Sequence, residues 1–488
     1  MRVVIAGCGR VGSQIAQALS LEGHNVVVID RDPRSFERLG ISFNGETMTG
    51  LAFDEKMLKG AGIEEADAFA AVTNYDNTNL MASEIAAGLF GVPRVIARVY
   101  NPDKELTYRA MGIDYICGST ILADIFHRFV TAGGIIAHAE WAGGMRVVEL
   151  EVGSAAGRLD IRGLRAPGAV RLMALVRGDK PVYFSRETHV IEGDRLIMAV
   201  NAGEGAYAEK LVPLALDIDD RGRVWSEVAG GRARRARGNW RVVLAGCGRV
   251  GTQLSEMLSL DGYHVTVIDR NQDAFTRLSK SFQGEAVKGI AFDMETLERA
   301  GIERADVFAA LTNYDNTNLM AAEVARRIYG VERVTSRLYN PDKEKTFQAL
   351  DINYFCGTTI LAERFMQRIV PGRLNVIAWT ANNRVLVAEF SCPSHFGGRT
   401  VEWLEREELL RVGFIGRGGV MTVATRDTVL EENDKVVAAV LAGRVARVRR
   451  LTAEGLPVAS SFRRTRARIV RSLALGSALK GGEKPSGS

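Results

Sequence analysis

The chain has 488 residues, of which 47% are hydrophobic and 25% are charged, a composition typical of soluble globular proteins with several domains. Its formal net charge is +5, but residues 444–488 hold eleven Lys or Arg against two Glu, and subtracting this +9 leaves −4 for the rest of the chain. A mildly acidic body argues against nucleic acid as a partner.

The first predicted strand, residues 3–7, runs into the loop GCGRVG, and the next predicted strand ends at Asp30. A GxGxxG loop between a strand and a helix, followed about 20 residues later by an acid, is the fingerprint of a dinucleotide-binding fold. In this pattern Gly7 permits the tight turn, Gly9 lets the backbone approach a pyrophosphate, and Gly12 lets the helix pack closely on the strand.

The charged groups around this loop suit a nucleotide. Free amides at the N-terminus of the following helix would bind phosphates. Arg10, next to Val11 in the loop, could reach a terminal phosphate with its guanidinium. Asp30 would accept hydrogen bonds from ribose hydroxyls and repel a 2′-phosphate, so NAD is favoured over NADP.

Beyond Asp30, short β-rich runs continue to alternate with helical ones. Asp54 and Asn101 are predicted helix N-caps, with Pro102 at the first helical position of the second. A last helix, at about 119–131, leaves the sheet for a smaller strand-rich unit. This alternation predicts an α/β domain with a parallel, doubly wound sheet. Its predicted strands are residues 3–7, 25–30, 46–50, 68–73, 94–100 and 114–117.

The sequence TNYDNTNLMA begins where the fourth predicted strand ends, at Thr73. Ligands on open α/β sheets bind beyond the carboxyl ends of the strands, so we expect Thr73, Asn74 and Asp76 to face the same crevice as the glycine loop. Helix capping by Asp76 or Thr78 is an alternative, and a packing surface between copies is another. Arg98 ends the fifth strand on the same side, although an ordinary surface arginine would also fit.

The whole unit is repeated, because VVIAGCGRVG at 3–12 returns as VVLAGCGRVG at 242–251 and TNYDNTNLMA returns at 312–321 without change. The offset is 239 over about 115 residues, and weaker similarity continues into the smaller unit. Two fingerprints in their proper context are much stronger than one. The equivalent candidate residues in the second copy are Gly246, Gly248, Arg249, Val250, Gly251, Asp269, Thr312, Asn313 and Arg337.

The repeat divides the chain into two doubly wound domains, each followed by a small α+β subdomain. Between the two units lies a polar, Gly/Arg-rich linker, and a basic tail that we expect to be disordered closes the chain. The predicted boundaries are 1–133, 134–216, 217–239 (linker), 240–372, 373–443 and 444–488 (tail).

Other chemistry finds little support in the sequence. None of the six histidines recurs at the matching place of the other copy, which argues against a repeated acid–base catalyst. The five cysteines show no metal spacing, so we expect no metal site; buried small residues are the preferred interpretation, with redox sensing as the alternative. No apolar run approaches the roughly 20 residues that span a bilayer and no signal-peptide pattern opens the chain, so we expect a cytoplasmic protein.

With the glycine loops, TNYDNTNLMA and the repeated YNPDK at 100–104 and 339–343, the chain resembles the TrkA family of Trk-type potassium uptake regulators. These proteins are built from tandem RCK-N and RCK-C domains, and the likeness covers about residues 1–443. It implies a Rossmann-like RCK-N domain and a small RCK-C subdomain in each copy. It also implies that the glycines, the two acids and the Thr–Asn pairs named above contact a nucleotide, with Arg10 and Arg249 meeting phosphates.

The resemblance further implies a regulatory subunit and not an enzyme. NAD(H), or ATP and ADP, would be the ligands. The partner would be a membrane potassium channel subunit of the TrkH or TrkG type, bound peripherally at the inner face of the cell membrane. Assembly into a homo-oligomer, a dimer or a tetramer ring, is expected.

Two features depart from the family pattern. Leu51 and Ile290 stand where many members carry an acid after the third strand, and the basic tail is longer than usual. A short amphipathic helix at about 462–475 could contact lipid or the channel, although solubilising disorder is favoured. The main alternative function is a soluble NAD-dependent oxidoreductase with a duplicated fold; a nucleotide-sensing scaffold for another cation channel or antiporter is a third.

Overall fold

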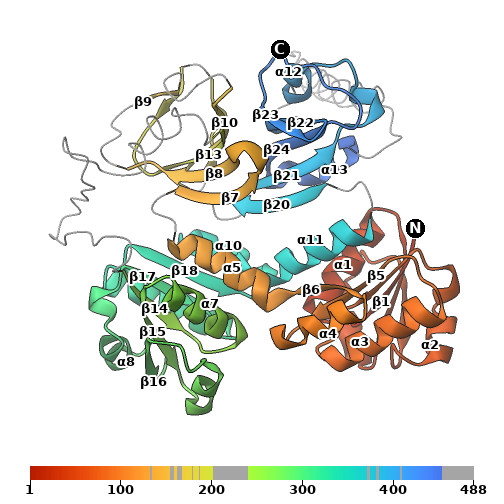
Figure 1. Cartoon of the computed structure of the whole chain (residues 1–488), viewed down its shortest axis with the longest axis horizontal. Helices are drawn as coiled ribbons and strands as arrows, with labels where there is room; N and C mark the ends of the chain where they lie inside the picture. The colour runs from red at the N-terminus through yellow and green to blue at the C-terminus, as the bar shows by residue number, and fades with distance from the viewer. Residues whose placement is uncertain are drawn as a thin grey trace, which may run out of the picture.

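The structure is a computed structural model. It describes residues 1–131, 135–153, 159–161, 168–178, 180–185, 187–201, 240–370, 374–380, 384–406 and 409–452. We name its four parts Rossmann domain 1 (1–131), C-lobe 1 (135–201), Rossmann domain 2 (240–370) and C-lobe 2 (374–452). Figure 1 shows the two Rossmann domains in a lower layer and the two C-lobes in an upper one. Among the helices described, none is long and apolar enough to cross a lipid bilayer.

Rossmann domain 1 is built on a parallel sheet in the order β3-β2-β1-β4-β5-β6, the order of dinucleotide-binding folds. Val3 and Ile5 of β1 pack on one face while Val4 and Ala6 pack on the other, because successive strand residues point to opposite sides. The elements are β1 (Arg2–Ala6), α1 (Arg10–Leu21), β2 (Asn25–Asp30), β3 (Glu46–Thr49), α2 (Glu55–Gly60), β4 (Ala68–Ala71), α3 (Asp76–Glu84), β5 (Val95–Val99), α4 (Glu105–Ala110), β6 (Asp114–Cys117) and α5 (Gly118–Thr131).

Rossmann domain 2 repeats this sheet in the order β16-β15-β14-β17-β18-β19. The predicted α/β class with two doubly wound domains is therefore confirmed. The predicted caps are also present, since Asp54 accepts a hydrogen bond from the Met57 amide and Asn101 from the Asp103 amide. The elements of Rossmann domain 2 are β14 (Arg241–Ala245), α7 (Arg249–Leu260), β15 (His264–Asp269), β16 (Glu285–Lys288), α8 (Met294–Arg299), β17 (Val307–Ala310), α9 (Asp315–Glu323), β18 (Arg333–Leu338), α10 (Glu344–Ala349), β19 (Asn353–Cys356) and α11 (Gly357–Ile369).

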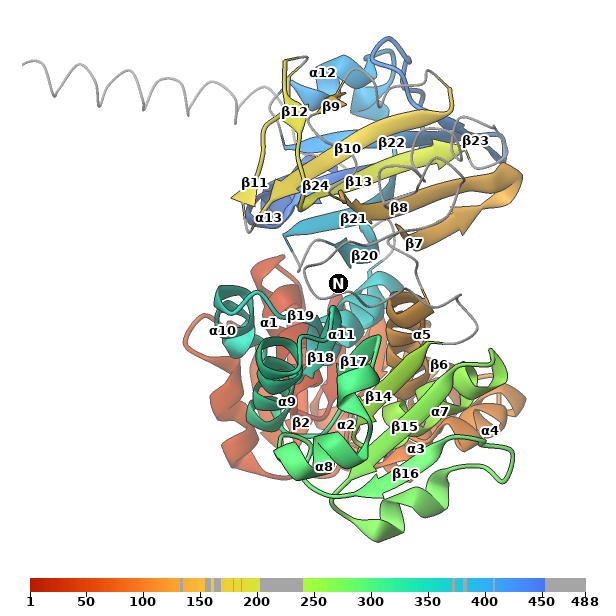
Figure 2. The same ribbon diagram turned by 90° about the vertical axis from the view of Figure 1, so that its left-hand side faces the viewer.

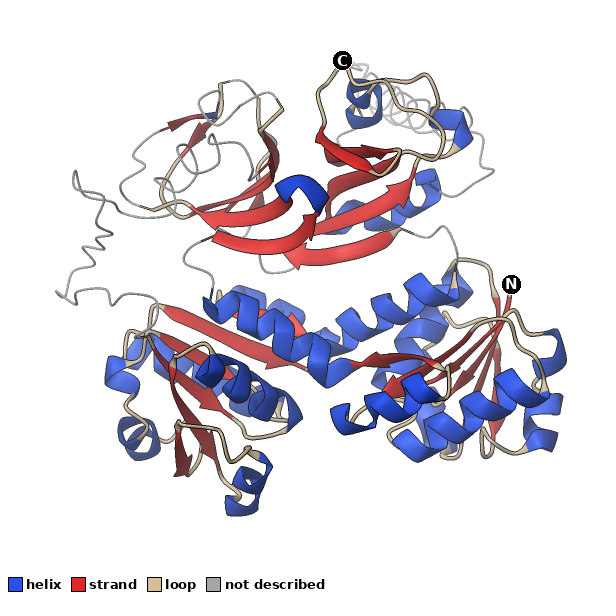
Figure 3. Ribbon diagram, in the orientation of Figure 1, coloured by secondary structure: helices blue, strands red, loops and turns tan. Residues whose placement is uncertain are grey.

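Each C-lobe holds a five-stranded antiparallel sheet, curved above the helices in Figure 3. The strand orders are β11-β10-β13-β8-β7 and β20-β21-β24-β22-β23. C-lobe 1 contains β7 (Ile135–Trp141), β8 (Met145–Glu151), β9 (Leu159–Asp160), β10 (Val170–Arg177), β11 (Lys180–Pro181), β12 (His189–Val190) and β13 (Asp194–Asn201). C-lobe 2 contains β20 (Asn375–Thr380), β21 (Val385–Ser391), α12 (Val401–Glu405), β22 (Leu410–Arg417), β23 (Val420–Val423), β24 (Lys435–Leu441) and α13 (Val445–Thr452).

The last helix of each Rossmann domain packs on the other Rossmann domain. Leu122 and Phe126 of α5 lie in one core with Val242 of β14, and Phe365 of α11 lies in one core with Val3 of β1. In Figure 1, α5 runs beside α7 and α11 beside α1. Fully burying one such side chain contributes about 1.5–3 kcal/mol. The exchange therefore holds the two Rossmann domains against each other.

Each C-lobe contacts the Rossmann domain of the other repeat, on which the preceding helix, α5 or α11, also packs. Arg195 of C-lobe 1 donates a hydrogen bond to Asn353 of Rossmann domain 2, at 3.2 Å. Arg449 of C-lobe 2 forms an ion pair with Glu22 of Rossmann domain 1, at 3.8 Å. Figure 2 shows C-lobe 1 above Rossmann domain 2. Each sequence repeat is thus divided between the two halves of the molecule.

The predicted disordered tail needs a correction at its start. Residues Val445–Thr452 form helix α13, because Val445 and Val448 are buried in the core of C-lobe 2. Arg449 of this helix also pairs with Glu363 of α11. The rest of the predicted tail, including the helix proposed at 462–475, and the predicted linker 217–239 lie outside the described residues.

Candidate functional site

One continuous cleft of about 1380 Å³ lies between the two Rossmann domains. It runs along the carboxyl ends of the strands in both domains, where ligands of open α/β sheets bind. The cleft brings together sixteen of the residues predicted from the sequence: Gly7, Gly9, Arg10, Val11, Asp30, Thr73, Asn74, Arg98, Gly246, Gly248, Arg249, Val250, Asp269, Thr312, Asn313 and Arg337. Gly12 and Gly251 are not part of its wall, and neither is Asp76, which the sequence predicted to face the same crevice.

The glycines of the first loop have three distinct geometries. Gly7 has φ +109°, and a Cβ there would lie 2.9 Å from the Thr73 amide nitrogen. A Cβ on Gly12 would lie 2.0 Å from the Gly7 carbonyl oxygen, so this residue serves helix packing. A Cβ on Gly9 would meet no atom within 4 Å. The loop is therefore tightly packed at Gly7 and Gly12, whereas the space at Gly9 is open and a phosphate group would fit there.

The second loop has the same geometry. Gly246 has φ +115°, and a Cβ on Gly251 would lie 1.9 Å from the Gly246 carbonyl oxygen. A Cβ on Gly248 would face open space. No described side chain caps the N-terminus of α1 or of α7. The amides of the first turn in both helices are therefore left for a ligand or for water.

Asp30 ties the end of β2 to the glycine loop. Its carboxylate accepts hydrogen bonds from the Cys8 amide at 2.6 Å and from the Asp32 amide at 2.9 Å. A carboxylate has about four lone-pair sites, so capacity remains for ribose hydroxyls in the cleft. In the second copy Asp269 accepts from the amides of Cys247 and Asn271.

The repeated TNYDNTNLMA has a structural role that the sequence did not reveal. Asp76 does not cap α3; its carboxylate accepts hydrogen bonds from the amides of Tyr100 and Asn101, at 2.7 and 3.0 Å. Asn79 is fully buried, accepts from the Thr73 amide and hydroxyl, and donates to the Arg98 carbonyl.

These bonds join the end of β4 to the end of β5. Asp315 and Asn318 make the same set in the second copy. Within the first copy of the phrase, Thr73, Asn74, Tyr75 and Thr78 line the cleft. The identity of the polar residues in the two copies is therefore explained in part by these hydrogen bonds behind the cleft wall, because Asp and Asn at these positions satisfy particular backbone groups.

Two half-buried arginines occupy the middle of the cleft. The Arg98 guanidinium lies 3.9 Å from the ring centre of Tyr100, and that of Arg337 lies 4.1 Å from the ring centre of Tyr339. The Nε atom of each is buried and has no hydrogen-bond partner among the described residues. Burial lowers the pKa of both guanidiniums, and the charge of Arg98 lowers the pKa of Arg337 further. An anion between the two guanidiniums would offset both the cost of burying them and their mutual repulsion.

The loop arginines reach across the cleft. Arg10 of Rossmann domain 1 lies over the Tyr339 ring of Rossmann domain 2, and Arg249 lies over the Tyr100 ring of Rossmann domain 1. Each tyrosine is thus flanked by two guanidiniums, one from each domain. Four positive charges meet where the crevices of the two Rossmann domains join.

Sequence reasoning did not assign Tyr100 and Tyr339, although the repeated YNPDK contains both. It also did not assign Arg31, which donates a hydrogen bond to the Tyr75 hydroxyl at 3.1 Å at the outer end of the first crevice. Arg270 and Tyr314 repeat this contact at 3.2 Å. An identical residue at the same offset in both copies was the signal available for all of these.

The cysteines do not have the character of redox sensors. All five are buried as free thiols. Burial raises the pKa of Cys8 to about 12 and that of Cys356 and of Cys392 to about 11, and it also raises the pKa of Cys117 and Cys247. Because the thiolate is the reactive form, these environments favour the structural interpretation. The described residues also contain no cluster of His, Cys, Asp and Glu that could hold a metal ion.

Comparisons with known proteins agree with this geometry. The family model of the TrkA-N domain matches residues 3–119 and 242–357, which hold both glycine loops. The Trk system potassium uptake protein TrkA of Streptomyces coelicolor is 40% identical over 205 residues, 42% of this chain and 92% of the relative. The chain belongs to the TrkA family. The TrkA of Halomonas elongata is 28% identical over 477 residues and covers 93% of this chain and 99% of the relative.

Solved structures support the same fold for this TrkA-family chain. The GsuK RCK domain superposes with a TM-score of 0.58 at 17% identity, covering 93% of this chain and 95% of that one. The GsuK channel bound to NAD gives the same TM-score at 18% identity, covering 92% of this chain and 78% of that one. The arrangement of two Rossmann domains and two C-lobes is therefore an RCK arrangement.

Proposed function

We propose that this chain is the cytoplasmic, nucleotide-binding regulatory subunit of a Trk-type potassium uptake system. In this proposal it acts as a ligand-operated clamp and not as an enzyme. The observation that carries the proposal is the single cleft, in which Arg10 and Arg249 each contact a tyrosine of the opposite Rossmann domain. A ligand there would touch both domains, so its binding energy would depend on how the domains are placed.

The ligand would be NAD(H), or ATP and ADP, with one nucleotide in each crevice. Gly7, Gly9 and the first turn of α1 would cradle the phosphates, Asp30 would bind the ribose hydroxyls, and Thr73 with Asn74 would line the other wall. The open space at Gly9 and the unpartnered Nε of Arg98 fit such a group. Gly246, Gly248, Asp269, Thr312, Asn313 and Arg337 would do the same in the second crevice.

Binding would favour a closed arrangement through charge. Phosphates placed between Arg98 and Arg337 would neutralise half-buried guanidiniums that belong to different domains. A triphosphate adds charge near Arg10 that a diphosphate or dinucleotide does not place there. A differential interaction of about 1–3 kcal/mol is typical of allosteric coupling and would be enough to bias a channel.

The partner would be a membrane potassium channel subunit of the TrkH or TrkG type. This chain would bind peripherally at the inner face of the cell membrane, as part of a homo-oligomer such as a dimer or a tetramer ring. Family membership supports this partner, since the relatives are named as Trk system potassium uptake proteins. The test is potassium flux into proteoliposomes that hold the membrane subunit together with this chain.

Flux should change with the nucleotide supplied, and Asp30→Ala with Asp269→Ala should abolish the dependence. Flux that is the same with every nucleotide, although nucleotides bind, would exclude the clamp. The second candidate is an NAD-dependent oxidoreductase, to which the cleft offers tyrosines but, within the described chain, neither a histidine nor a lysine. Substrate-dependent formation of NADH would favour that alternative.

A further inference from the structure

The two C-lobes pack face to face through sheets that descend from one ancestral sheet. Val147 and Ala199 of C-lobe 1 share a buried core with Val387, Phe414 and Val437 of C-lobe 2. The strands at this interface match at an offset of 240. Arg177 pairs with the buried carboxylate of Asp194 at 2.8 Å, and Arg417 pairs with the buried carboxylate of Asp434 at the same distance, while both arginine side chains are exposed. Faces of common origin could pair either with each other or with a second copy of themselves.

One difference between the two faces is the size of a side chain. Met173 of β10 and Gly413 of β22 are equivalent residues, and each lies at a register shift of its strand. The two residues face each other, because a Cβ built on Gly413 would lie 2.6 Å from the Met173 sulfur and 2.9 Å from the Ala199 Cβ. The thioether of Met173 therefore occupies the space that a side chain at 413 would need.

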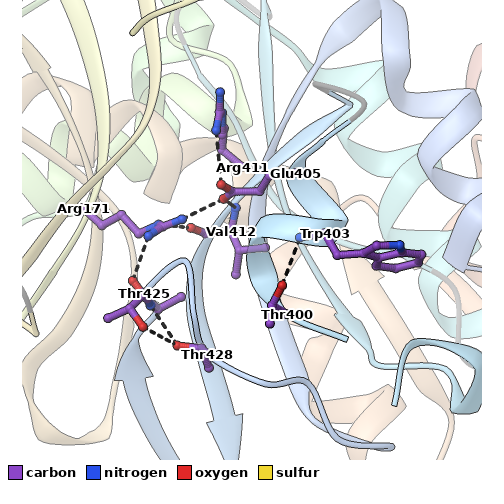
Figure 4. A network of polar contacts seen from close by, with 9 residues as sticks. Arg171, Thr400, Trp403, Glu405, Arg411, Val412, Thr425 and Thr428 are labelled. Carbon is purple, nitrogen blue, oxygen red and sulfur yellow. Dashed lines mark hydrogen bonds and ion pairs between the residues drawn. The ribbon is translucent and has the colours of Figure 1, made fainter. Parts of the chain in front are cut away.

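The second difference is charge, centred on Glu405 of α12. The Glu405 side chain is only 4% exposed, and it accepts hydrogen bonds from Arg171 of C-lobe 1 at 2.9 Å and from the Val412 amide at 2.9 Å. Arg171 also donates to the carbonyls of Val412 and Ala424, at 2.7 and 3.1 Å. Figure 4 shows the Arg171 side chain pointing from C-lobe 1 toward Glu405 and Val412 of C-lobe 2.

The sequence differs at the equivalent of Glu405 in the other copy. Arg411, the equivalent of Arg171, also bonds to Glu405, at 3.2 Å, and its guanidinium lies 5.4 Å from the ring centre of Phe184 in C-lobe 1. At the same offset of 240, the residue equivalent to Glu405 is Arg165, which lies outside the described residues. The carboxylate of one copy is thus a cation in the other.

We propose that the C-lobes recognise each other and exclude a second copy of themselves. Two C-lobe 1 faces would bring Met173 against Met173, which overpacks the interface, and Arg171 would lose the carboxylate of Glu405, whose equivalent in the sequence of C-lobe 1 is Arg165. Two C-lobe 2 faces would leave Gly413 opposite Gly413, which creates a void. The partner that fits either face is the other C-lobe, and one chain carries one of each. The differences between the two faces therefore specify pairing inside one chain. Two identical faces would not do so, because each could also pair with a second copy of itself.

The size difference can be tested with variants that make the two faces alike. Gly413→Met gives methionine on both faces, and Met173→Gly gives glycine on both. The double variant Met173→Gly/Gly413→Met makes them complementary again in the reverse sense. Each single change should lower the melting temperature of the full chain, Gly413→Met by roughly 3 °C or more, and the double variant should recover at least half of the larger loss.

Hydrogen–deuterium exchange supplies the local readout for these variants. Exchange in β10 and β22 should rise in the single variants and fall again in the double variant. A double variant whose loss equals the sum of the two single losses would overturn the proposal, because Gly413 would then serve only its own strand. Should Gly413→Met prevent folding, Gly413→Ala with Met173→Ala tests the same contact at smaller volume.

The charge difference gives an independent test with a matched control. Glu405→Arg should raise exchange in β10 and lower the melting temperature, whereas Glu402→Arg, on the exposed side of the same helix, should change neither. Equal effects of the changes at 405 and 402 would contradict selective pairing.

Discussion

The guanidinium carbon of Arg10 lies 5.7 Å from the ring centre of Tyr339, a residue of the other Rossmann domain. The pair formed by Arg249 and Tyr100 is its counterpart, at 5.8 Å. Each glycine loop therefore holds its arginine against the opposite crevice. Under the proposed function, a nucleotide in one crevice would therefore act on an arginine that contacts the other crevice, without any contact between the two ligands.

Tyr339→Leu should weaken binding in the first crevice, because the ring helps to hold the Arg10 guanidinium inside the cleft. A cation–π contact contributes about 0.5–2 kcal/mol, so ATP affinity should fall by roughly 3- to 30-fold. The measurement is titration calorimetry in a chain whose second crevice is disabled by Asp269→Ala. Tyr314→Leu, at the outer end of the second crevice and away from Arg10, is the control. Equal losses in the two variants would rule out the cross-domain contact.

Arg98→Met should stabilise the ligand-free protein but weaken its binding of ATP. The guanidinium is desolvated and its Nε has no partner among the described residues, so replacing it with an apolar side chain of similar length should raise the melting temperature of the ligand-free protein. The same change should remove most of the rise in melting temperature that ATP produces. A fall in ligand-free stability would show that Arg98 has a structural role.

Asn79→Leu should destabilise Rossmann domain 1. The fully buried amide satisfies the Thr73 amide and the Arg98 carbonyl, and leaving such groups unpaired costs about 1–3 kcal/mol each. Asn77→Leu in the same helix is the control, since Asn77 is exposed and bonds only to Lys104 among the contacts described. Urea unfolding followed by circular dichroism measures both. The account would fail here if the two variants lost equal stability.

The buried thiols predict a pH dependence with a definite sign. The pKa of each thiol is raised above its ordinary value of 9.0, to about 12 for Cys8. Unfolded chains would release these protons above pH 9 while folded chains keep them. The thiols' contribution to stability is therefore complete below pH 9 and is lost as the pH rises toward the raised values.

Reactivity checks the thiols directly. A disulfide reagent such as Ellman's should label the native chain very slowly at pH 8 and should label all five cysteines once urea is added. Rapid labelling of one cysteine in the native chain would support the redox alternative instead.

The sequence predicted those parts of the fold that depend on local patterns. The glycine loops, Asp30 with its repeat, and the strands of the first sheet follow from spacing and periodicity. The exchange of α5 and α11 could not be predicted, because the apolar side of a helix that carries Leu122 and Phe126 shows that it is buried but not which domain buries it. Likewise, the bonds of Asp76 and Asn79 reach backbone groups 19 to 25 residues away, which no local pattern displays.

The central claim is that one chain holds two working nucleotide sites. Titration calorimetry of the purified chain with ATP, ADP, NAD and NADH tests it most directly, for the natural sequence and for Asp30→Ala and Asp269→Ala. We predict binding of at least one of these nucleotides at two per chain, reduced to one per chain by either substitution and absent when both are combined. Binding that neither substitution alters, or no binding of any of the four, would contradict the account.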